Sequence, residues 1–303
     1  MTRRQRIGRD LRVNKYVYIM MIPVLAFLIV FSYVPMYGIV IAFNNYSPAK
    51  GIFGSEWVGF EHFITFFQSH FFWRLMKNTL VLSLYDLIFA FPSSIIFALL
   101  LNEVHKRRYK KIVQTISYMP NFISLVVIAS LVMTFTSETG PLNALVRMFG
   151  GEPVDLLGVK ELFPAIYVVS GIWQGVGFGS IIYLAAISSI DQELYNAAVV
   201  DGANRFKQAI HVTLPCIAPT IIILLILRLG GMLSVGYEKI ILLANGNIME
   251  TADVISTYVY RMGILQFNYS YSTAIGLYNT IINFILLLSA NRISRKMTDT
   301  SLW

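Results

Sequence analysis

The residues best suited to a mechanical role form one polar segment, Glu193–Pro215, between two long apolar runs. Glu193 opens it, and negative charge near the start of a helix is favoured by the helix dipole. Ala197 and Ala198 are small enough for another surface to approach closely. Gly202 can adopt backbone conformations that other residues resist, which suits a sharp bend between two short helices. The segment therefore predicts a helix–bend–helix connection that a partner protein can grip.

The apolar runs around this segment indicate an all-α integral membrane protein. The chain has 56% hydrophobic and 13% charged residues, whereas soluble domains have roughly half apolar and a quarter charged residues. The apolar residues sit in blocks, and about 20 helical residues suffice to span a bilayer. Six transmembrane helices are predicted: Tyr16–Phe43, Leu75–Leu101, Ile116–Thr136, Phe163–Ile187, Pro215–Val235 and Tyr271–Ala290.

Positive charge is concentrated in three short flanks of these spans. Short flanks rich in Lys and Arg stay cytoplasmic, so both termini are expected in the cytoplasm, as an even number of spans requires. Contact with anionic lipid headgroups explains the net charge of +8, and no nucleic acid is expected as a partner. The flanking residues are Arg3, Arg4, Arg6, Arg9, Arg12 and Lys15; Lys106, Arg107, Arg108, Lys110 and Lys111; and Arg292, Arg295 and Lys296.

The predicted organisation is a single membrane domain with two tails. Residues 1–15 form a basic cytoplasmic N-terminal tail, 16–290 the six-helix domain with its loop at 188–214, and 291–303 a cytoplasmic C-terminal tail. The three connections on the outer side are longer and less basic.

Two short helices are predicted within the outer connections. Ser55–Phe63 places Trp57 at headgroup depth, where tryptophan is enriched. Glu250–Gly263 is expected to start at a Thr251 cap and to stop at Gly263.

The polar segment resembles the cytoplasmic coupling loop of permeases from binding-protein-dependent ABC importers. The family's Glu-Ala-Ala signature precedes an Asp-Gly-Ala, and here Asn196 stands at the Glu position. Glu193 lies three residues earlier on the same helical face and can substitute for it. The resemblance implies that the ATPase is contacted by Glu193, Asn196, Ala197, Ala198, Asp201, Gly202, Ala203, Arg205, Phe206 and Pro215.

The resemblance extends over nearly the whole chain and is most specific for one subgroup. Asn102–Lys111, Tyr118–Ser124, Gly140–Asn143 and Ala252–Gly263 match the carbohydrate permeases of Gram-positive bacteria that import oligo- or polysaccharide fragments. It implies a type I ABC importer permease fold in the plasma membrane. It also implies a heterodimer with a second homologous permease, two ATPase subunits, an extracellular sugar-binding lipoprotein and a sugar substrate, all in membrane lipid.

Nucleotide chemistry is expected in another chain. No Gly-x-x-x-x-Gly-Lys-Ser/Thr motif is present, and that motif supplies the phosphate cradle of many ATPases. The resemblance accordingly implies ATP and Mg on the partner ATPase, with no cofactor held by this chain.

The fourth span carries a stripe of glycines, Gly171, Gly175 and Gly179, at every fourth position. This small-xxx-small spacing is typical of membrane helices that pack closely. A dinucleotide-binding loop is the alternative, but it needs a preceding strand, and the site would lie in lipid. The stripe therefore predicts helix packing.

Aromatic and amide side chains in two spans are candidates for the substrate path. Trp173 and Gln174 flank the glycine stripe, and Tyr278, Asn279 and Asn283 lie in the sixth span. An aromatic face can stack on a sugar ring, while an amide both donates to and accepts from hydroxyls. The alternative is that Trp173 faces lipid and Gln174 bonds a neighbouring helix.

Asp86 and Arg228 are the charges placed deepest within predicted spans. A charge at the bilayer centre costs roughly 2.5–3.5 kcal/mol on insertion scales, so both should face protein or water. They can pair across the second and fifth spans, or either can touch substrate, and the sequence leaves both options open.

Two other classes of function fit the sequence less well than an importer does. An ion-coupled secondary sugar carrier should show related halves with broken helices, and no internal repeat is visible. A membrane-embedded enzyme needs clustered His or acidic residues within spans, yet the chain has four His and a single cysteine, Cys216. We therefore expect no catalytic residues, no metal site and no enzymatic activity in this chain.

Overall fold

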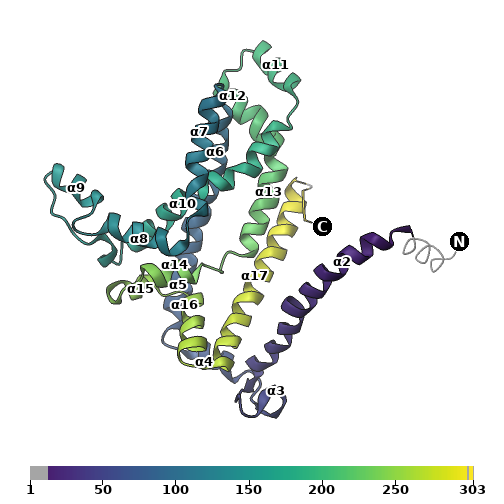
Figure 1. Cartoon of the computed structure of the whole chain (residues 1–303), viewed down its shortest axis with the longest axis vertical. Helices are drawn as coiled ribbons and strands as arrows, with labels where there is room; N and C mark the ends of the chain where they lie inside the picture. The colour runs from purple at the N-terminus through teal and green to yellow at the C-terminus, as the bar shows by residue number, and fades with distance from the viewer. Residues whose placement is uncertain (1–12, 299, 303) are drawn as a thin grey trace. The chain divides into compact units, whose positions relative to one another are not determined.

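The computed structural model describes residues 13–298 and 300–302 as helices joined by short connections (Figure 1). The basic residues Arg3, Arg4, Arg6, Arg9 and Arg12 lie outside the described residues. Within the described part, six helical segments are long and apolar enough to cross a membrane, which confirms the predicted helical fold with six spans. They are Lys15–Phe43, Phe72–Asn102, Leu125–Met148, Phe163–Ser188, Arg205–Gly230 and Tyr269–Thr298.

The chain divides into two compact units. The first holds the described residues up to Phe67 together with Met262–Leu277, and the second holds Gln68–Arg261 and the described residues from Tyr278 onward. The last helix, α17 (Tyr269–Thr298), contributes to both. The predicted single domain 16–290 is thus distributed over both units, and its unity stays a prediction.

The first unit is built around a small aromatic core. Phe63 and Ala274 pack with Ala42, and Phe43 covers them. Its elements are α2 (Lys15–Leu28), η1 (Ile29–Tyr33), η2 (Val34–Phe43), β1 (Asn44–Asn45), α3 (Gly51–Gly54), β2 (Glu56–Trp57), α4 (Glu61–Gln68) and η8 (Arg261–Leu265), the last two of which extend into the neighbouring unit.

The predicted helix at Ser55–Phe63 is wrong. Glu56–Trp57 pairs as an antiparallel strand with Asn44–Asn45, and Gly59 has a φ of +60°. Glycine tolerates this left-handed conformation, so the chain turns there and the helix begins only at Glu61.

The second unit is arranged around α10, which packs against α6, α7 and α13. Gly177 allows the close approach of α7, because a Cβ there would lie 2.2 Å from the carbonyl oxygen of Ser117. The elements of this unit are α5 (Phe72–Tyr85), η3 (Asp86–Ala90), α6 (Phe91–Asn102), α7 (Arg107–Tyr118), η4 (Met119–Phe122), α8 (Leu125–Thr136), α9 (Pro141–Met148), η5 (Leu156–Gly158), α10 (Phe163–Ser188), α11 (Gln192–Val200), α12 (Arg205–Gln208), η6 (Ala209–Thr213), α13 (Leu214–Gly230), α14 (Tyr237–Leu243), η7 (Gly246–Ile248), α15 (Met249–Ala252) and α16 (Ile255–Tyr260).

The third predicted span, Ile116–Thr136, is not one helix. Helix α7 ends at Tyr118, and α8 begins at Leu125 after a 3-10 turn that contains Pro120. Proline cannot donate to the helical ladder, and the Ser124 side chain accepts a hydrogen bond from the Val127 N–H at 3.4 Å as the cap of a new helix. The membrane-length segment in this region therefore runs from α8 into α9.

Glu250–Gly263 is also divided, which corrects the single helix predicted there. Helix α15 ends at Ala252, and α16 begins only at Ile255. Thr251 lies inside α15 and donates to the Lys160 carbonyl at 2.7 Å instead of capping a helix. Gly263 lies inside η8 and does not end it.

Three of the membrane-length helices contain a wide π-helical turn just before a proline. The turns η1, η3 and η6 are followed, after one intervening residue, by Pro35, Pro92 and Pro215. A proline clashes with the carbonyl four residues earlier and leaves it without a donor, and a wider turn at that carbonyl relieves both problems. The helix that contains the fifth span consequently begins at Arg205, before the predicted Pro215, and ends at Gly230, before the predicted Val235.

Candidate functional site

The polar segment after α10 folds as two short helices with a tight bend. The Asp191 carboxylate accepts from the Glu193 N–H at 2.9 Å and caps α11. At the other end, the Ala203 N–H donates to the Ala198 carbonyl at 2.8 Å and the Gly202 N–H to the Val199 carbonyl at 3.0 Å. This pair of bonds closes a helix through a residue in the left-handed region, and Gly202 has a φ of +77°.

Hydrogen bonds tie α11 to the turn η6 and hold the start of α12 against the bend. The Tyr195 hydroxyl lies 2.9 Å from the Thr213 hydroxyl. The Gln208 side chain is buried and donates to the Ala203 carbonyl at 2.9 Å. The Asn204 side chain accepts from the Lys207 N–H at 2.9 Å and caps α12. The Tyr195–Thr213 contact therefore connects α11 directly to the fifth membrane-length helix.

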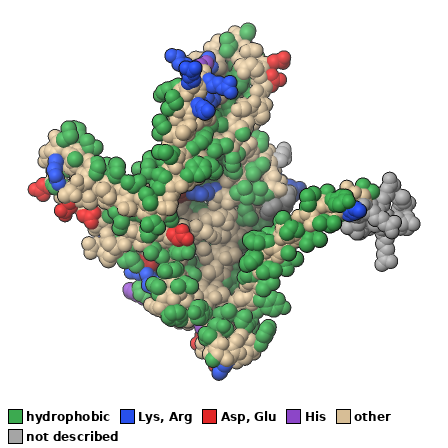
Figure 2. All heavy atoms as spheres, viewed as in Figure 1, with side chains coloured by type: hydrophobic (Ala, Val, Ile, Leu, Met, Phe, Trp, Pro, Cys, Tyr) green, Lys and Arg blue, Asp and Glu red, His purple; other side chains and the backbone are tan. Residues whose placement is uncertain are grey.

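Arg205 links the segment to the connection that follows α6. Its guanidinium lies 3.7 Å from the Glu103 carboxylate and 3.2 Å from His105 Nε2. Figure 2 shows Lys and Arg side chains gathered at this end of the second unit, where α7 and α12 lie. Arg205 is thus engaged within the chain as well as being a predicted ATPase contact.

The segment presents an exposed apolar surface that the sequence reasoning did not single out. Val200 is 87% exposed, Phe206 73% and Val199 60%. Of these three residues, Phe206 was among the predicted contact residues and the two valines were not. The presence of two valines in an otherwise polar stretch was the sequence signal that could have indicated this surface. Exposed apolar groups clustered among polar ones are typical of a protein–protein contact.

The predicted contact residues are placed on this same segment. Most are exposed, whereas Ala198 and Ala203 at the bend are half-buried. Glu193 and Asn196 are both exposed on α11. Contact of any of these residues with an ATPase stays a prediction.

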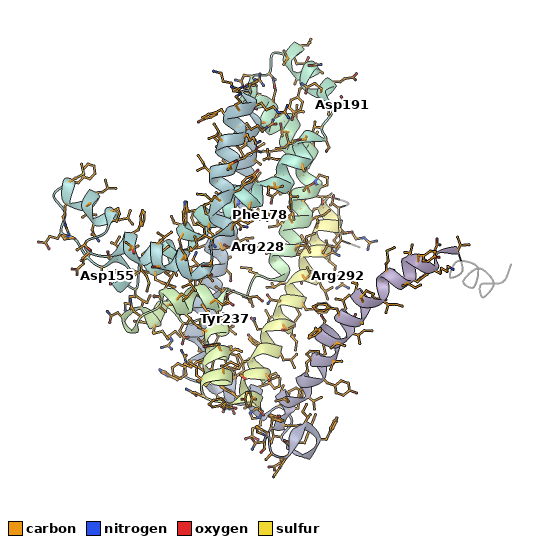
Figure 3. All side chains as sticks on the ribbon, viewed as in Figure 1. Asp155, Phe178, Asp191, Arg228, Tyr237 and Arg292 are labelled. Atoms are coloured by element: carbon orange, nitrogen blue, oxygen red, sulfur yellow. The ribbon has the colours of Figure 1, made fainter. Side chains whose placement is uncertain are left out.

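Of the two options left open for Asp86 and Arg228, pairing is observed, because the two side chains form an ion pair, whereas contact of either with substrate stays a prediction. Asp86 begins the π-helical turn η3, and Arg228 lies in the last turn of α13. Arg228 lies midway along the second unit, away from the segment that carries Asp191 (Figure 3). The pair therefore joins the second and fifth membrane-length helices.

Two cavities meet at this ion pair. The smaller has a volume of about 170 Å³, and Ser83, Tyr167 and Ser234 bring hydroxyl groups to its wall. The larger, of about 480 Å³, is bordered by α10 and α13. Asp86 and Arg228 line both cavities, so the charged pair forms part of the boundary of each.

A second cation lies beside these cavities. Lys239 of α14 is buried, and its Nζ donates to the Tyr167 carbonyl at 3.0 Å and lies 4.8 Å from the centre of the Tyr167 ring. Burial lowers the pKa of Lys239 to about 8, and the negative charge of Asp86 opposes that shift. Among the described residues, no carboxylate lies within 4.0 Å of its amine.

The predicted glycine stripe lines the larger cavity with all three of its members. A Cβ on Gly179 would lie 2.7 Å from the Ser94 hydroxyl, so α10 approaches α6 closely there. A Cβ on Gly175 would meet no atom of another described element within 4 Å. Close packing along the whole stripe therefore stays a prediction.

The five substrate-path candidates are not brought together at these cavities. Trp173 is 47% exposed, and neither it nor Gln174 is among the residues that line them. Asn283 is buried, where it accepts from the Leu233 N–H at 2.9 Å and donates to the Ser234 hydroxyl at 3.1 Å. The Tyr278 hydroxyl donates to the Met76 sulfur at 3.6 Å, and the buried Asn279 Oδ1 has no hydrogen-bond partner among the residues that the structure describes. Contact of any of the five with a sugar stays a prediction.

A buried carboxylate fastens the α15–α16 connection to α5. The Asp253 side chain is fully buried and accepts from Arg74 at 3.1 Å, Arg261 at 2.7 Å and Thr257 at 2.8 Å. In the described part of the chain, no three His, Cys, Asp or Glu side chains are grouped so that they could hold a metal ion.

Comparison with known proteins identifies the family. Residues 90–299 match the family of binding-protein-dependent transport system inner membrane components. The chain belongs to this family. It is a membrane-embedded permease that works with a solute-binding protein, it is not an enzyme, and ATP hydrolysis belongs to a separate subunit.

The similarity to individual proteins covers almost the full length. The chain is 45% identical to protein LplB of Bacillus subtilis over 97% of this chain and 92% of that protein. It is 44% identical to the polygalacturonan/rhamnogalacturonan transport system permease protein YteP of the same organism, over 99% and 94% of the two chains.

A solved structure shows the same fold. The crystal structure of a bacterial ABC transporter for the acidic polysaccharide alginate, in complex with its alginate pentasaccharide-bound periplasmic protein, contains a chain that is 45% identical. The TM-score is 0.90, over 98% of this chain and 100% of that chain. The resemblance to carbohydrate ABC permeases is thereby confirmed, and it favours the importer over an ion-coupled carrier or a membrane-embedded enzyme.

Proposed function

We propose that this permease imports oligosaccharide or polysaccharide fragments across the cell membrane, driven by a separate ATPase that acts on the Glu193–Pro215 segment. The observation that carries the proposal is the full-length similarity to the permease YteP and to a chain of the alginate importer. The helix–bend–helix segment with its exposed valines supports the proposed route of coupling.

The proposed assembly contains three kinds of partner protein and the sugar. A second, homologous permease completes the translocation path as a heterodimer, and two ATPase subunits bind ATP and Mg. An extracellular lipoprotein delivers the sugar. The family supports the binding protein directly, while the other subunits are inferred from how ABC importers assemble.

Both termini are proposed to lie in the cytoplasm. Lys106 immediately precedes α7, Arg107 and Arg108 are its first two residues, and Arg292 and Arg295 lie near the end of α17. Short basic flanks are retained on the cytoplasmic side. This orientation exposes α11 and α12 to a cytoplasmic ATPase.

The proposed motion begins at α11. ATP-driven closure of the ATPase pair pulls this helix, and the Tyr195–Thr213 and Gln208–Ala203 contacts pass the force to α13. The Asp86–Arg228 pair then connects α13 to the second membrane-length helix. The bundle moves as a unit and exposes the path alternately to the two sides.

The import function is tested by ATP-dependent uptake of trigalacturonate into vesicles that contain the complete transporter and its binding protein. Uptake that needs ATP, both permeases and the binding protein is the expected result. A complete, ATP-hydrolysing complex that takes up no oligosaccharide would contradict the proposed function.

The coupling route is tested by Gly202→Val in the same vesicles. A β-branched residue at a φ of +77° is strained by roughly 1–2 kcal/mol, so the bend should open and uptake should be lost while the protein stays in the membrane. Gly246→Val is the matched control, because its φ lies outside the left-handed region and a Cβ there would meet no other described atom within 4 Å. Normal uptake by well-expressed Gly202→Val would exclude the bend from coupling.

A further inference from the structure

The ion pair between the two cavities leaves most of the N–H donors of Arg228 without a partner among the described residues. Arg228 has five N–H donors, and among the described residues Asp86 is its recorded partner. Its side chain is 53% exposed and lines both cavities. The guanidinium therefore has donors available for a ligand that reaches either cavity.

The charges around the pair do not balance. Arg228 and the buried Lys239 are two cations, and within the described part of the chain Asp86 is the one carboxylate recorded as interacting with them. Lys239 contacts Tyr167, which lines the smaller cavity. The Lys239 amine would also lie 3.4 Å from a Cβ added to Gly171, a residue that lines the larger cavity. An anionic ligand would restore neutrality there, whereas a neutral ligand would not.

The smaller cavity also offers groups that match sugar hydroxyls. The Ser234 hydroxyl accepts from Asn283, which leaves its own proton free to donate. Tyr167 brings an aromatic ring with a hydroxyl to the same wall. Hydroxyl groups beside a guanidinium suit a ligand that carries both hydroxyls and a carboxylate.

We propose that Arg228 receives the carboxylate of an acidic sugar unit during transport, and that Asp86 is the counter-ion that holds Arg228 while the path is empty. The substrate class is then uronate-bearing oligosaccharides. This inference rests on the proposed import function and assigns its specificity to one residue. Arg228 suits the role because a planar guanidinium binds a carboxylate through two parallel hydrogen bonds.

The test uses the chain's single cysteine. In the complete transporter, Cys216→Ser removes the native thiol and Ser234→Cys places a new one on the wall of the smaller cavity. Labelling rates are measured with an anionic and a cationic methanethiosulfonate of similar size. Labelling is then repeated with trigalacturonate and with its carboxyl-reduced, neutral counterpart.

The anionic reagent is expected to react roughly tenfold faster than the cationic one, because a cationic cavity concentrates anions. Trigalacturonate should slow labelling, and the neutral trisaccharide should not. Arg228→Gln should abolish both the charge preference and the protection, Arg228→Lys should keep the preference but weaken the protection, and Asp86→Asn should strengthen the protection. The double variant Asp86→Asn/Arg228→Gln replaces the ion pair with two amides, so it tests the missing charge if Arg228→Gln alone fails to assemble.

Equal protection by the two trisaccharides would overturn the proposal, as would unchanged protection in an assembled variant that lacks the Arg228 charge. Uptake is also measured with the transporter that keeps its native Asp86 and Arg228, and this measurement separates the inference from the import function. If the transporter imports the oligosaccharide but the charged and neutral trisaccharides protect the cavity equally, only the role of Arg228 is refuted. A complete transporter that imports none refutes the proposed function itself.

Discussion

Two aspartate–arginine sites in the second unit differ in how completely the fold uses their hydrogen-bonding capacity. Asp253 is fully buried and accepts from Arg74, Arg261 and Thr257. Asp86 is 29% exposed and pairs with Arg228 alone among the described residues. Both sites join distant parts of the chain, and the second lines the two cavities described above.

The difference distinguishes a carboxylate with a structural role, Asp253, from one whose arginine partner is accessible to a ligand, Asp86. At Asp253 the neighbouring backbone is fastened as well, since Asn78 donates to the Glu250 and Asp253 carbonyls at 2.8 and 2.9 Å. A ligand could not displace any of these bonds without opening a buried connection. At Asp86 a ligand carboxylate could replace one partner of an accessible pair without disturbing the core.

The largest effect is expected for Asp253→Ala. It leaves two arginine side chains without their acceptor, and removing one partner of a buried ion pair costs about 3–5 kcal/mol. The apparent melting temperature of the purified complex should fall by about 6 °C or more, with Asp253→Asn falling less because its amide oxygen still accepts. If the melting temperature of Asp253→Ala fell by less than about 2 °C, Asp253 would not have a structural role, and the contrast between the two sites would be wrong.

Lys239→Met is expected to stabilise the protein at pH 7. Burial lowers the pKa of Lys239 from 10.5 to about 8, a penalty of about 3 kcal/mol for the charged form. Losing the hydrogen bond to the Tyr167 carbonyl costs about 1 kcal/mol. The net increase in the free energy of unfolding is therefore about 2 kcal/mol.

The same residue predicts a pH dependence with a definite sign. Between about pH 8 and pH 10.5 the unfolded chain keeps the Lys239 proton that the folded chain has released, so its contribution to stability rises with pH in that window. The rise should be absent in Lys239→Met. Melting curves of both proteins across this range measure the difference, and parallel curves would contradict the assigned burial.

Asp86→Asn is expected to change stability by less than about 1 kcal/mol, because partly exposed pairs contribute little. Its effect should appear instead in the protection of the cavity by trigalacturonate. The comparison is sharpened by measuring Asp86→Asn and Asp253→Asn side by side in melting and in uptake. Equal losses of melting temperature would show that the two carboxylates have the same structural role.

The smallest effect is expected at the exposed pair of Lys160 and Glu250, whose charged groups are 2.7 Å apart. Their hydrogen bond raises the pKa of Lys160 and lowers that of Glu250. The pair's contribution is therefore constant from mildly acidic to mildly alkaline pH, decreasing only as pH falls through the Glu250 pKa or rises through that of Lys160. Lys160→Ala should leave the melting temperature at neutral pH unchanged within error, and a clear decrease would show that exposure does not separate these sites.

Features that depend on local chemistry were predictable from the sequence. The six membrane-length helices follow from apolar runs, because hydropathy acts wherever such a run occurs. The bend at Gly202 was predicted because glycine alone adopts a positive φ without strain. Whether this segment contacts an ATPase stays a prediction.

Breaks inside helices were less predictable, because competing local signals have to be weighed. Around Pro120 and Ser124, apolar residues on both sides suggested one span, whereas the structure places a helix end and a new cap there. At Pro215 the reverse occurred, since a π-helical turn allows the helix to continue through a residue that usually starts one.

The arrangement of charge was decided only by tertiary structure. The sequence itself determined that Asp86 and Arg228 lie within apolar runs and therefore need partners or water. They are 142 residues apart, and no local pattern says which side chain each will meet. Lys239 and Asp253 carry no sequence signal at all for their burial, because that depends on how α14 and the α15–α16 connection pack against α10 and α5. Spans and bends come from the chemistry of neighbouring residues, whereas the paired and unpaired charges at the cavities exist only because folding brings distant helices together.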